Sequence, residues 1–293
     1  WLHWIRKHPF GVLTCFRGGL RSQTVQGWLE KAGVEIPRLN GGYKAYRQWS
    51  SRCLQENFFF PRVLVISGNT GSGKTQLLQS LNQSLDLEGF AGHRGSAFGG
   101  HFAEKVAQAN FENNLAEALW LYRNSCGAKG GGALCFVEDE SRTIGSCVIP
   151  PEFFIHMRAA PAVLVTESLE VRREFILQEY VVNKGLSRKP SEAPLQANAE
   201  FLFERYQDSI RRLSRKLGDA KARELLKHLQ TALQIWQSGQ DPDEWHRMWI
   251  HDLLKFYYDP LYEKSFQRRN PKLIFRGTRK EVFDFLKGFS DGF

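Results

Sequence analysis

The sequence predicts an α/β protein in which a parallel, doubly wound sheet carries a phosphate-binding loop. Three observations lead to this fold class. Short apolar runs alternate with helical stretches along most of the chain. The segment 68–75, GNTGSGKT, stands between an apolar run and a helical one. A separate strand–loop–helix pattern precedes residue 52. We therefore expect a P-loop sheet domain that follows a smaller α/β fragment.

The first part of the chain, residues 1–52, has the pattern of a piece of a parallel sheet. Residues 11–14 and 34–39 predict short strands, and residues 22–32 and 41–49 predict helices. So few elements cannot bury both faces of a sheet. We expect the C-terminal remnant of a larger domain, with an exposed sheet edge.

A P-loop domain is expected over residues 53–190, because strand-like and helical patterns alternate there. The expected elements are a linker at 50–60, a strand at 62–68, a helix at 74–85, a loop at 86–100, a helix at 102–124, a glycine-rich loop and strand at 127–141, a strand at 160–167 and a helix at 168–181.

The pattern changes after residue 182. Residues 182–197 interrupt it, and residues 198–258 are helical in character, in about three segments. We assign 191–270 as a helical segment. A strand at 272–275 and a helix at 279–289 follow, and we expect residues 271–293 to return to the P-loop sheet.

Composition limits the environment and the partners. The 293 residues hold no apolar run near the roughly 20 residues that a membrane helix needs. Five cysteines without a CxxC pair argue against a disulfide framework or a structural zinc site, so we expect a cytoplasmic protein without a membrane partner. The N-terminus shows no secretory signal. A net charge of +9 favours a polyanionic partner. The RNA-binding candidates are Arg205, Arg211, Arg212, Arg215 and Lys216.

The GNTGSGKT segment matches the P-loop pattern without a gap. Its glycines let successive backbone N–H groups point inward at an anion, and Lys74 adds a positive charge. The hydroxyl of Thr75 can reach a magnesium ion. The segment predicts a di- or triphosphate site but does not say which molecule carries that group. Its candidate residues are Gly68, Asn69, Thr70, Gly71, Ser72, Gly73, Lys74 and Thr75.

The apolar run that ends in FVEDES, residues 136–141, resembles a Walker B element. We take Glu138, Asp139, Glu140 and Arg142 as its candidate site residues. If Mg²⁺ binds, Thr75 and Asp139 are the expected ligands, with Glu138 as the alternative to Asp139. In the preceding loop, His93, Arg94 and Ser96 are candidates for further anion contacts. A nucleotide-base pocket, a lid arginine and a positioned water are not recognisable in the sequence.

A second reactive loop surrounds Cys15 in TCFRGGLRS, residues 14–22. The loop amides and two arginines can lower the pKa of a thiol and stabilise a thiolate or a bound oxyanion. Sulfur transfer, selenium transfer and phosphate-ester cleavage all fit such a loop. The Cys-x5-Arg spacing is that of cysteine phosphatases, but Thr14 stands where they usually have His. The candidate catalytic residues are Cys15, Arg17, Gly18, Gly19 and Arg21.

Six stretches together resemble bacterial tRNA 2-selenouridine synthases, a family that joins a rhodanese domain to a P-loop domain. They occur in the family's order and span nearly the whole chain. They are CFRGGLRSQTVQGWL (15–29), GGYKAYR (41–47), GNTGSGKT (68–75), HRGSAFG (93–99), VEDESRTIG (137–145) and YYDPLY (257–262). Only fourteen residues precede Cys15, so the resemblance implies that most of the rhodanese domain is absent from this chain.

The resemblance implies an enzyme that acts on tRNA with a wobble 2-thiouridine. Such an enzyme alkylates the sulfur with geranyl diphosphate and then replaces the S-geranyl group by selenium from selenophosphate, for which a selenophosphate supplier is the expected partner. Cys15 corresponds to the rhodanese cysteine, and residues 68–75 would hold the diphosphate. The geranyl tail needs an apolar groove, for which we select Trp245, Trp249, Phe256 and Tyr257.

Other readings of the residues remain open at this point. One is a P-loop NTPase or kinase with a cysteine-based sulfurtransferase or phosphatase-like module. Another is a non-catalytic RNA-binding module, which the basic segment 205–228 motivates. Nucleotide turnover would favour the first reading, and two complete reactive loops argue against the second.

Overall fold

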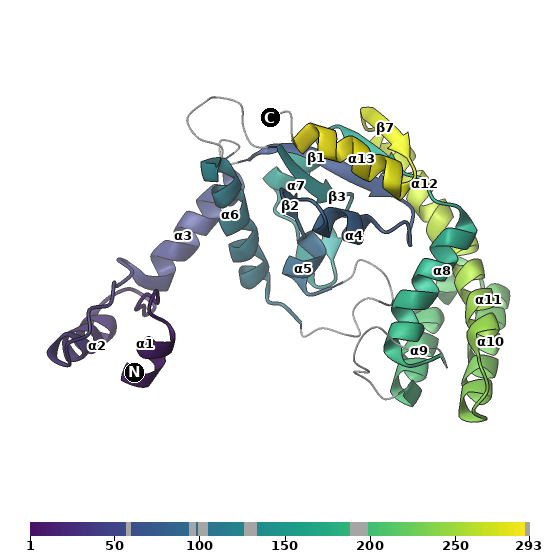
Figure 1. Ribbon diagram of the computed structural model, residues 1–293, viewed down its shortest axis with the longest axis horizontal. Helices are drawn as coiled ribbons and strands as arrows, with labels where there is room; N and C mark the ends of the chain where they lie inside the picture. Colours follow the sequence, from purple (N-terminus) through teal and green to yellow (C-terminus); the bar gives the residue numbers. More distant parts are fainter. Residues whose placement is uncertain (57–59, 94–97, 99–104, 126–133, 188–198, 291–293) are drawn as a thin grey trace.

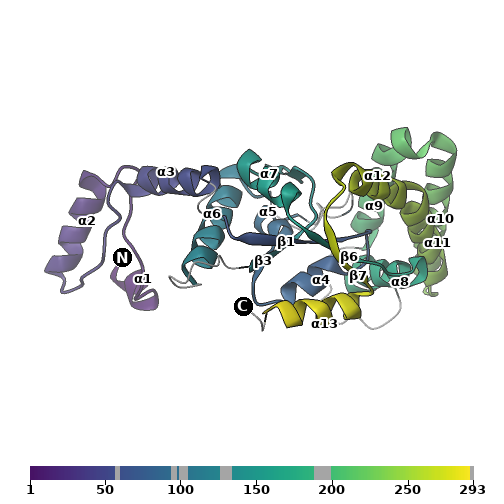
Figure 2. The same cartoon turned by 90° about the horizontal axis from the view of Figure 1, so that it is seen from above.

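The computed structural model describes residues 1–56, 60–93, 98, 105–125, 134–187 and 199–290. Its elements form three parts in a row (Figure 1, Figure 2). An N-terminal part with α1 (Leu2–Lys7), α2 (Leu20–Lys31) and α3 (Gly42–Gln55) lies at one end. The central sheet follows, and a group of long helices lies at the other end.

The central sheet has five parallel strands in the order β2-β3-β1-β6-β7 among the described residues. The strands are β1 (Arg62–Gly68), β2 (Ser84–Leu85), β3 (Leu134–Glu138), β6 (Ala162–Val165) and β7 (Leu273–Gly277). This arrangement confirms the expected α/β class with a parallel sheet. β1 lies in the middle, so its carboxyl end lies between those of β3 and β6, where parallel sheets bind ligands.

Both faces of the sheet are buried, because successive side chains of a strand point to opposite faces. Val63 and Val65 of β1 pack toward α3, α5 (Leu87–Ala91), α6 (Gln108–Ser125) and α7 (Pro151–Ala159). Leu64 and Ile66 pack toward α4 (Lys74–Gln79) and α13 (Arg279–Ser290). The apolar side chains of β1 therefore contribute to two hydrophobic cores, one on each face of the sheet, as expected for a buried parallel strand.

Several elements of this domain differ from the sequence prediction. The helix expected over 74–85 ends at Gln79, because residues 84–85 instead form β2 at the sheet edge. The loop expected at 86–100 contains α5, which Asp86 caps by accepting from the Gly89 N–H at 2.7 Å. The hairpin of β4 (Thr143–Ile144) and β5 (Cys147–Val148) and the helix α7 were not expected.

The helical part follows β6. Its elements are α8 (Leu169–Tyr180), η3 (Val182–Lys184), α9 (Ala199–Leu217), α10 (Asp219–Gln237), α11 (Asp243–Leu253), the π-helical turn η4 (Leu254–Tyr258) and α12 (Asp259–Arg269). One core holds these helices together, with Phe203, Tyr206 and Trp249 fully buried at its centre. None of the helices described in the chain is long and apolar enough to cross a membrane.

The N-terminal part is much less buried. The strands expected at 11–14 and 34–39 reduce to a single parallel bridge between Leu13 and Arg38. Its core consists of Leu13, Leu29 and Ile36, while Trp4, Phe10, Phe16 and Trp28 are exposed. The helix expected to end at residue 49 continues to Gln55, so α3 occupies much of the expected linker. Pairing needs partner strands, and the described part of this segment supplies none beyond the bridge.

Candidate active site

The P-loop connects β1 to α4 at the carboxyl edge of the sheet. Gly71 and Gly73 have φ values of +83° and +77°, a region that only glycine enters readily. The side-chain ammonium of Lys74 donates to the carbonyl of Gly68 at 2.7 Å. The backbone path of the loop therefore requires glycine at positions 71 and 73.

A cavity of about 270 Å³ opens beside this loop. Phosphate-loop residues and carboxylates form one side, and α8 forms the other. The lining residues include Thr70, Gly71, Gly73, Lys74, Thr75, Glu88, Glu138, Glu140, Phe175, Ile176, Glu179 and Tyr180. The cavity thus brings the loop and the acidic strand end together, although these segments are some sixty residues apart in the chain.

The acidic side chains at the end of β3 point to two different sides of the sheet. Glu138 and Glu140 line the cavity. Asp139 points the other way, because alternate residues of an extended chain face opposite sides. Its carboxylate accepts from Ser67 at 2.7 Å and pairs with the buried Arg269 at 2.9 Å. Of the two acids considered as metal ligands, Glu138 therefore faces the cavity and Asp139 does not.

The two inward carboxyls are perturbed by their surroundings. Burial, reinforced by the charge of Glu88, raises the pKa of Glu138 to about 8. The same two causes raise the pKa of Glu140 to about 7. Lys74 opposes both shifts but does not cancel them. The cavity therefore favours protons or added positive charge on these carboxyls near neutral pH.

The remaining anion-site candidates lie elsewhere or outside the described residues. The His93 ring packs against Gly145 of the β4–β5 hairpin, and its backbone N–H donates to the Glu88 carbonyl at 3.0 Å. Arg142, just before the hairpin, is exposed. Arg94 and Ser96 lie outside the described residues. The structure thus groups the P-loop with Glu138 and Glu140, and it does not bring His93 to the cavity lining.

Residues far along the chain fix the shape of the P-loop. Asp259 makes two 2.7 Å contacts with the buried guanidinium of Arg172 and accepts from Asn69 at 2.8 Å. Arg172 also donates to the Thr70 carbonyl at 3.2 Å. The Gly68 N–H donates to the hydroxyl of Tyr262 at 2.6 Å. The YYDPLY stretch, which carries no predicted role, thus contacts the P-loop directly through Asp259 and Tyr262.

A small apolar pocket of about 30 Å³ adjoins the P-loop cavity. The two share Thr70, Ile176 and Tyr180. Of the four aromatic groove candidates, Trp249 lines this pocket, together with Leu253, Leu254 and Tyr258. Tyr257 belongs to the helical core, Trp245 packs at its edge, and Phe256 is 46% exposed.

The cysteine loop has its own local geometry. The sulfur of Cys15 lies 3.2 Å from the Ser22 hydroxyl, on the first turns of α2. This hydrogen bond is the main reason that the pKa of Cys15 falls to about 7. Arg17 and Arg21 are exposed. The loop therefore presents a thiol that is about half ionised near pH 7.

The first turn of helix α3 is hydrogen-bonded to the cysteine loop. The N–H groups of Tyr43 and Lys44 donate to the carbonyls of Cys15 and Phe16 at 3.0 and 2.9 Å. Gly42 has φ of +62°, and a Cβ there would lie 2.1 Å from the Cys15 carbonyl oxygen. These contacts give the GGYKAYR stretch a structural role next to the thiol.

The structure does not bring the two reactive loops together. α2, which follows Cys15, lies at one end of the molecule in both views, and α3 separates it from the sheet (Figure 1, Figure 2). The basic candidates all lie on α9 at the far end. Arg211 pairs with Asp208 at 2.8 Å, Arg205 stacks over Phe201, and Arg212, Arg215 and Lys216 are exposed.

Comparison with known proteins relates both loops to one family. The sequence model described as "tRNA 2-selenouridine synthase AAA domain" matches residues 61–291. A tRNA 2-selenouridine synthase of Bdellovibrio bacteriovorus is 38% identical over 98% of this chain and 77% of its own length. Proteins of the same name from Pseudomonas savastanoi and Pseudomonas syringae are 40% and 41% identical, over 99% and 98% of this chain and 78% and 76% of their own lengths.

No solved structure matches the chain. The sequence relationship nevertheless covers the cysteine loop, the P-loop cavity and the YYDPLY contacts. The chain belongs to the tRNA 2-selenouridine synthase family.

Proposed function

We propose that this protein converts a wobble 2-thiouridine of tRNA into 2-selenouridine in two steps on two loops. In the first step the uridine sulfur is S-geranylated from geranyl diphosphate at the P-loop. In the second step selenium from selenophosphate replaces the S-geranyl group, with Cys15 as the reactive thiol. The names of the relatives support the overall conversion.

One observation supports the assignment of the first step to the P-loop: the phosphate-loop cavity and an adjoining small apolar pocket share Thr70, Ile176 and Tyr180 in their linings. A prenyl diphosphate has this same combination of a charged head and an apolar tail. With the head at Lys74, the chain would lie along Ile176 and Tyr180 toward Trp249. Burial of the tail would contribute roughly 0.8 kcal/mol per CH₂ group.

The chemistry of the first step needs what the P-loop offers. The allylic C–O bond breaks, a C–S bond forms, and the uridine N3 proton is lost. Negative charge grows on the leaving diphosphate, where Lys74 and the loop N–H groups stabilise it. No γ-phosphate and no attacking water take part, so this step needs none of the NTPase parts that are not recognisable in the sequence.

The second step needs a leaving group at C2 of the uridine. Alkylation turns the thiocarbonyl into a thioether, so geranylthiolate can leave when the selenium of selenophosphate attacks C2. Water then cleaves the Se–P bond and releases phosphate, which leaves selenium on C2. A thiol with a pKa of about 7, as at Cys15, is ionised enough at neutral pH to take part in chalcogen transfer. This proposal includes the assignment of residues 1–52 as part of a rhodanese-like domain.

The test is mass analysis of thiolated tRNA incubated first with geranyl diphosphate and then with selenophosphate. Lys74→Ala should lower geranylation by about 100-fold or more, because an oriented charge at the leaving group is lost. Cys15→Ala should abolish selenation and leave geranylation within about twofold, with Thr14→Ala as the matched control. Equal loss of both steps in a folded Cys15→Ala protein would contradict the division between loops.

A further inference from the structure

Three glutamates from separate elements meet at the base of the P-loop cavity. Glu88 lies in the first turn of α5, Glu138 ends β3, and Glu140 follows two residues later. Strand pairing explains their meeting. Leu85 of β2 pairs with Val137 of β3, so the segments that leave the two strands run side by side. One carboxylate oxygen from each glutamate lies within 4.8 Å of the others.

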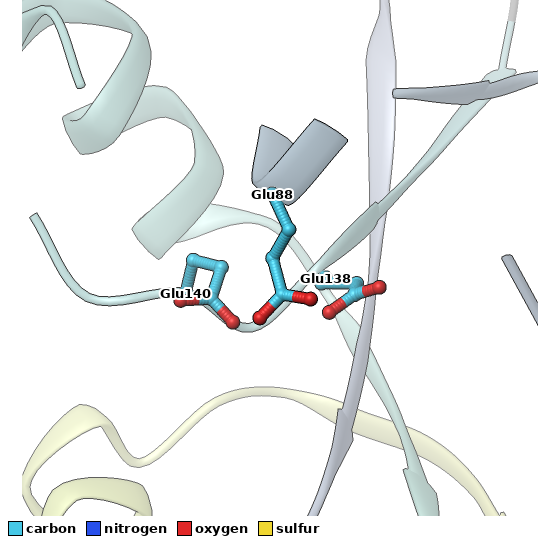
Figure 3. A group of neighbouring side chains, drawn as sticks. All are labelled: Glu88, Glu138 and Glu140. Carbon is cyan, nitrogen blue, oxygen red and sulfur yellow. The ribbon is translucent and has the colours of Figure 1, made fainter. Parts of the chain in front are cut away.

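We propose that Glu88, Glu138 and Glu140 bind one divalent cation beside the P-loop. In Figure 3 the carboxylate of Glu88 lies between those of Glu138 and Glu140. The hydroxyl of Thr75 lies 3.5 Å from Glu88, so the site is continuous with the phosphate loop. The inference goes beyond the proposed function, because these groups would bind a cation whether or not the donor is geranyl diphosphate.

A buried carboxylate oxygen without a hydrogen-bond partner among the described residues indicates that a cation binds here. Glu138 is only 2% exposed, and its Oε1 has no hydrogen-bond partner among the described residues. A buried carboxylate oxygen left in this way is costly. The ammonium group of Lys74 is hydrogen-bonded to the Gly68 carbonyl at 2.7 Å. One lysine also cannot balance three carboxylates, whereas a cation between them would satisfy the orphaned oxygen and the charge together.

The donor set selects the class of cation. Three carboxylates and a hydroxyl are hard oxygen ligands, which favour Mg²⁺ or Mn²⁺ over zinc or copper. Ligands at about 2.1 Å from a common Mg²⁺ lie at most about 4.2 Å apart. The 4.8 Å limit on the observed spacing is close to this value, and side-chain rotation of the partly buried Glu88 and Glu140 can close the difference.

The adjacent acids at the end of β3 have different roles in this arrangement. Asp139 is committed to Arg269 and Ser67 on the other side of the sheet. The cation site thus uses the residues on either side of Asp139, plus Glu88. Glu138 within the site and Thr75 beside it are shared with the sequence expectation for Mg²⁺.

The experiment is a titration of the full chain with Mn²⁺, followed by electron paramagnetic resonance, in the absence of tRNA and prenyl donor. We expect one Mn²⁺ per chain, displaced by excess Mg²⁺. Glu138→Gln should weaken Mn²⁺ binding at least about 10-fold, because it replaces a ligand with a neutral amide. Glu179→Gln, which removes a carboxylate from the same cavity but outside the cluster, should change binding by less than about threefold.

Thermal unfolding provides a second measurement and a check of folding. Mg²⁺ should raise the unfolding temperature of the wild type and of Glu179→Gln, and should leave that of Glu138→Gln and Glu140→Gln unchanged. Absence of Mn²⁺ binding by the wild type would overturn the inference, as would equal loss in Glu179→Gln and folded Glu138→Gln. Because no donor is present, failure here leaves the proposed geranylation untouched, and failure of geranylation leaves the cation site untouched.

Discussion

The cysteine loop and the P-loop are both glycine-containing loops between an extended segment and a helix, yet the molecule supports them in opposite ways. Cys15 takes its low pKa from Ser22, seven residues away, and its loop is held by the start of α3. The P-loop is held by side chains about 100 and 190 residues away, Arg172 and Asp259. The lowered pKa of the thiol thus has a local cause, whereas the conformation of the P-loop depends on the assembled domain.

The largest effect should come from breaking the long-range support. Asp259→Ala leaves the Arg172 guanidinium, whose side chain is 5% exposed, without its partner carboxylate. We expect a loss of about 3 kcal/mol in the free energy of unfolding, at the low end for a buried pair because Asp259 is partly exposed. Pyrophosphate binding, measured by calorimetry, should weaken about 10-fold, since Asn69 and Thr70 lose their anchor.

The matched control for this change is Asp208→Ala, which breaks an exposed pair with Arg211. That variant should lose less than about 1 kcal/mol. Alkylation of Cys15 by iodoacetamide should be the same in both variants. A change in thiol reactivity in Asp259→Ala would show that the two loops are energetically linked, and it would break the comparison.

A smaller effect is expected from the N-terminal core. Leu29 is 3% exposed and packs in a cluster with Leu13 and Ile36. Leu29→Ala should cost about 2 kcal/mol, near the lower limit for a leucine, because so small a cluster can collapse around the gap. Hydrogen exchange should become faster in residues 1–40 and stay unchanged in β1 and β3.

Leu20→Ala is the control for that change, because Leu20 is 80% exposed and should be nearly neutral. If Leu29→Ala speeds exchange in β1 to the same extent, the N-terminal part and the sheet unfold together. The interpretation that the cysteine loop is supported locally, independently of the sheet, would then be wrong.

The same contrast explains what the sequence could predict. The P-loop was predictable because eight consecutive residues specify both its backbone path and its chemistry. β2 was not, because Leu85 also continues the apolar spacing of a helix and only its pairing with Val137 makes it a strand. The roles of Asp139 and its neighbours depended on which side of β3 each faces, and Arg172 and Glu88 carry no local signal at all.

The smallest and most local effect should follow from Ser22→Ala. Ser22 is the main cause of the lowered pKa of Cys15, which is about 7. Without the hydroxyl, the thiolate loses a hydrogen bond, so the pKa should rise toward the ordinary value of about 8.5. The rate of alkylation by iodoacetamide, measured from pH 5.5 to 9.5, should reach half its maximum near pH 7 in the wild type and at a higher pH in the variant. Thr14→Ala is the control, because that hydroxyl contacts the Cys15 carbonyl oxygen rather than the sulfur. An unshifted profile in Ser22→Ala would mean that more distant groups set the thiol pKa, and the cysteine loop would then resemble the P-loop in its dependence on the rest of the chain.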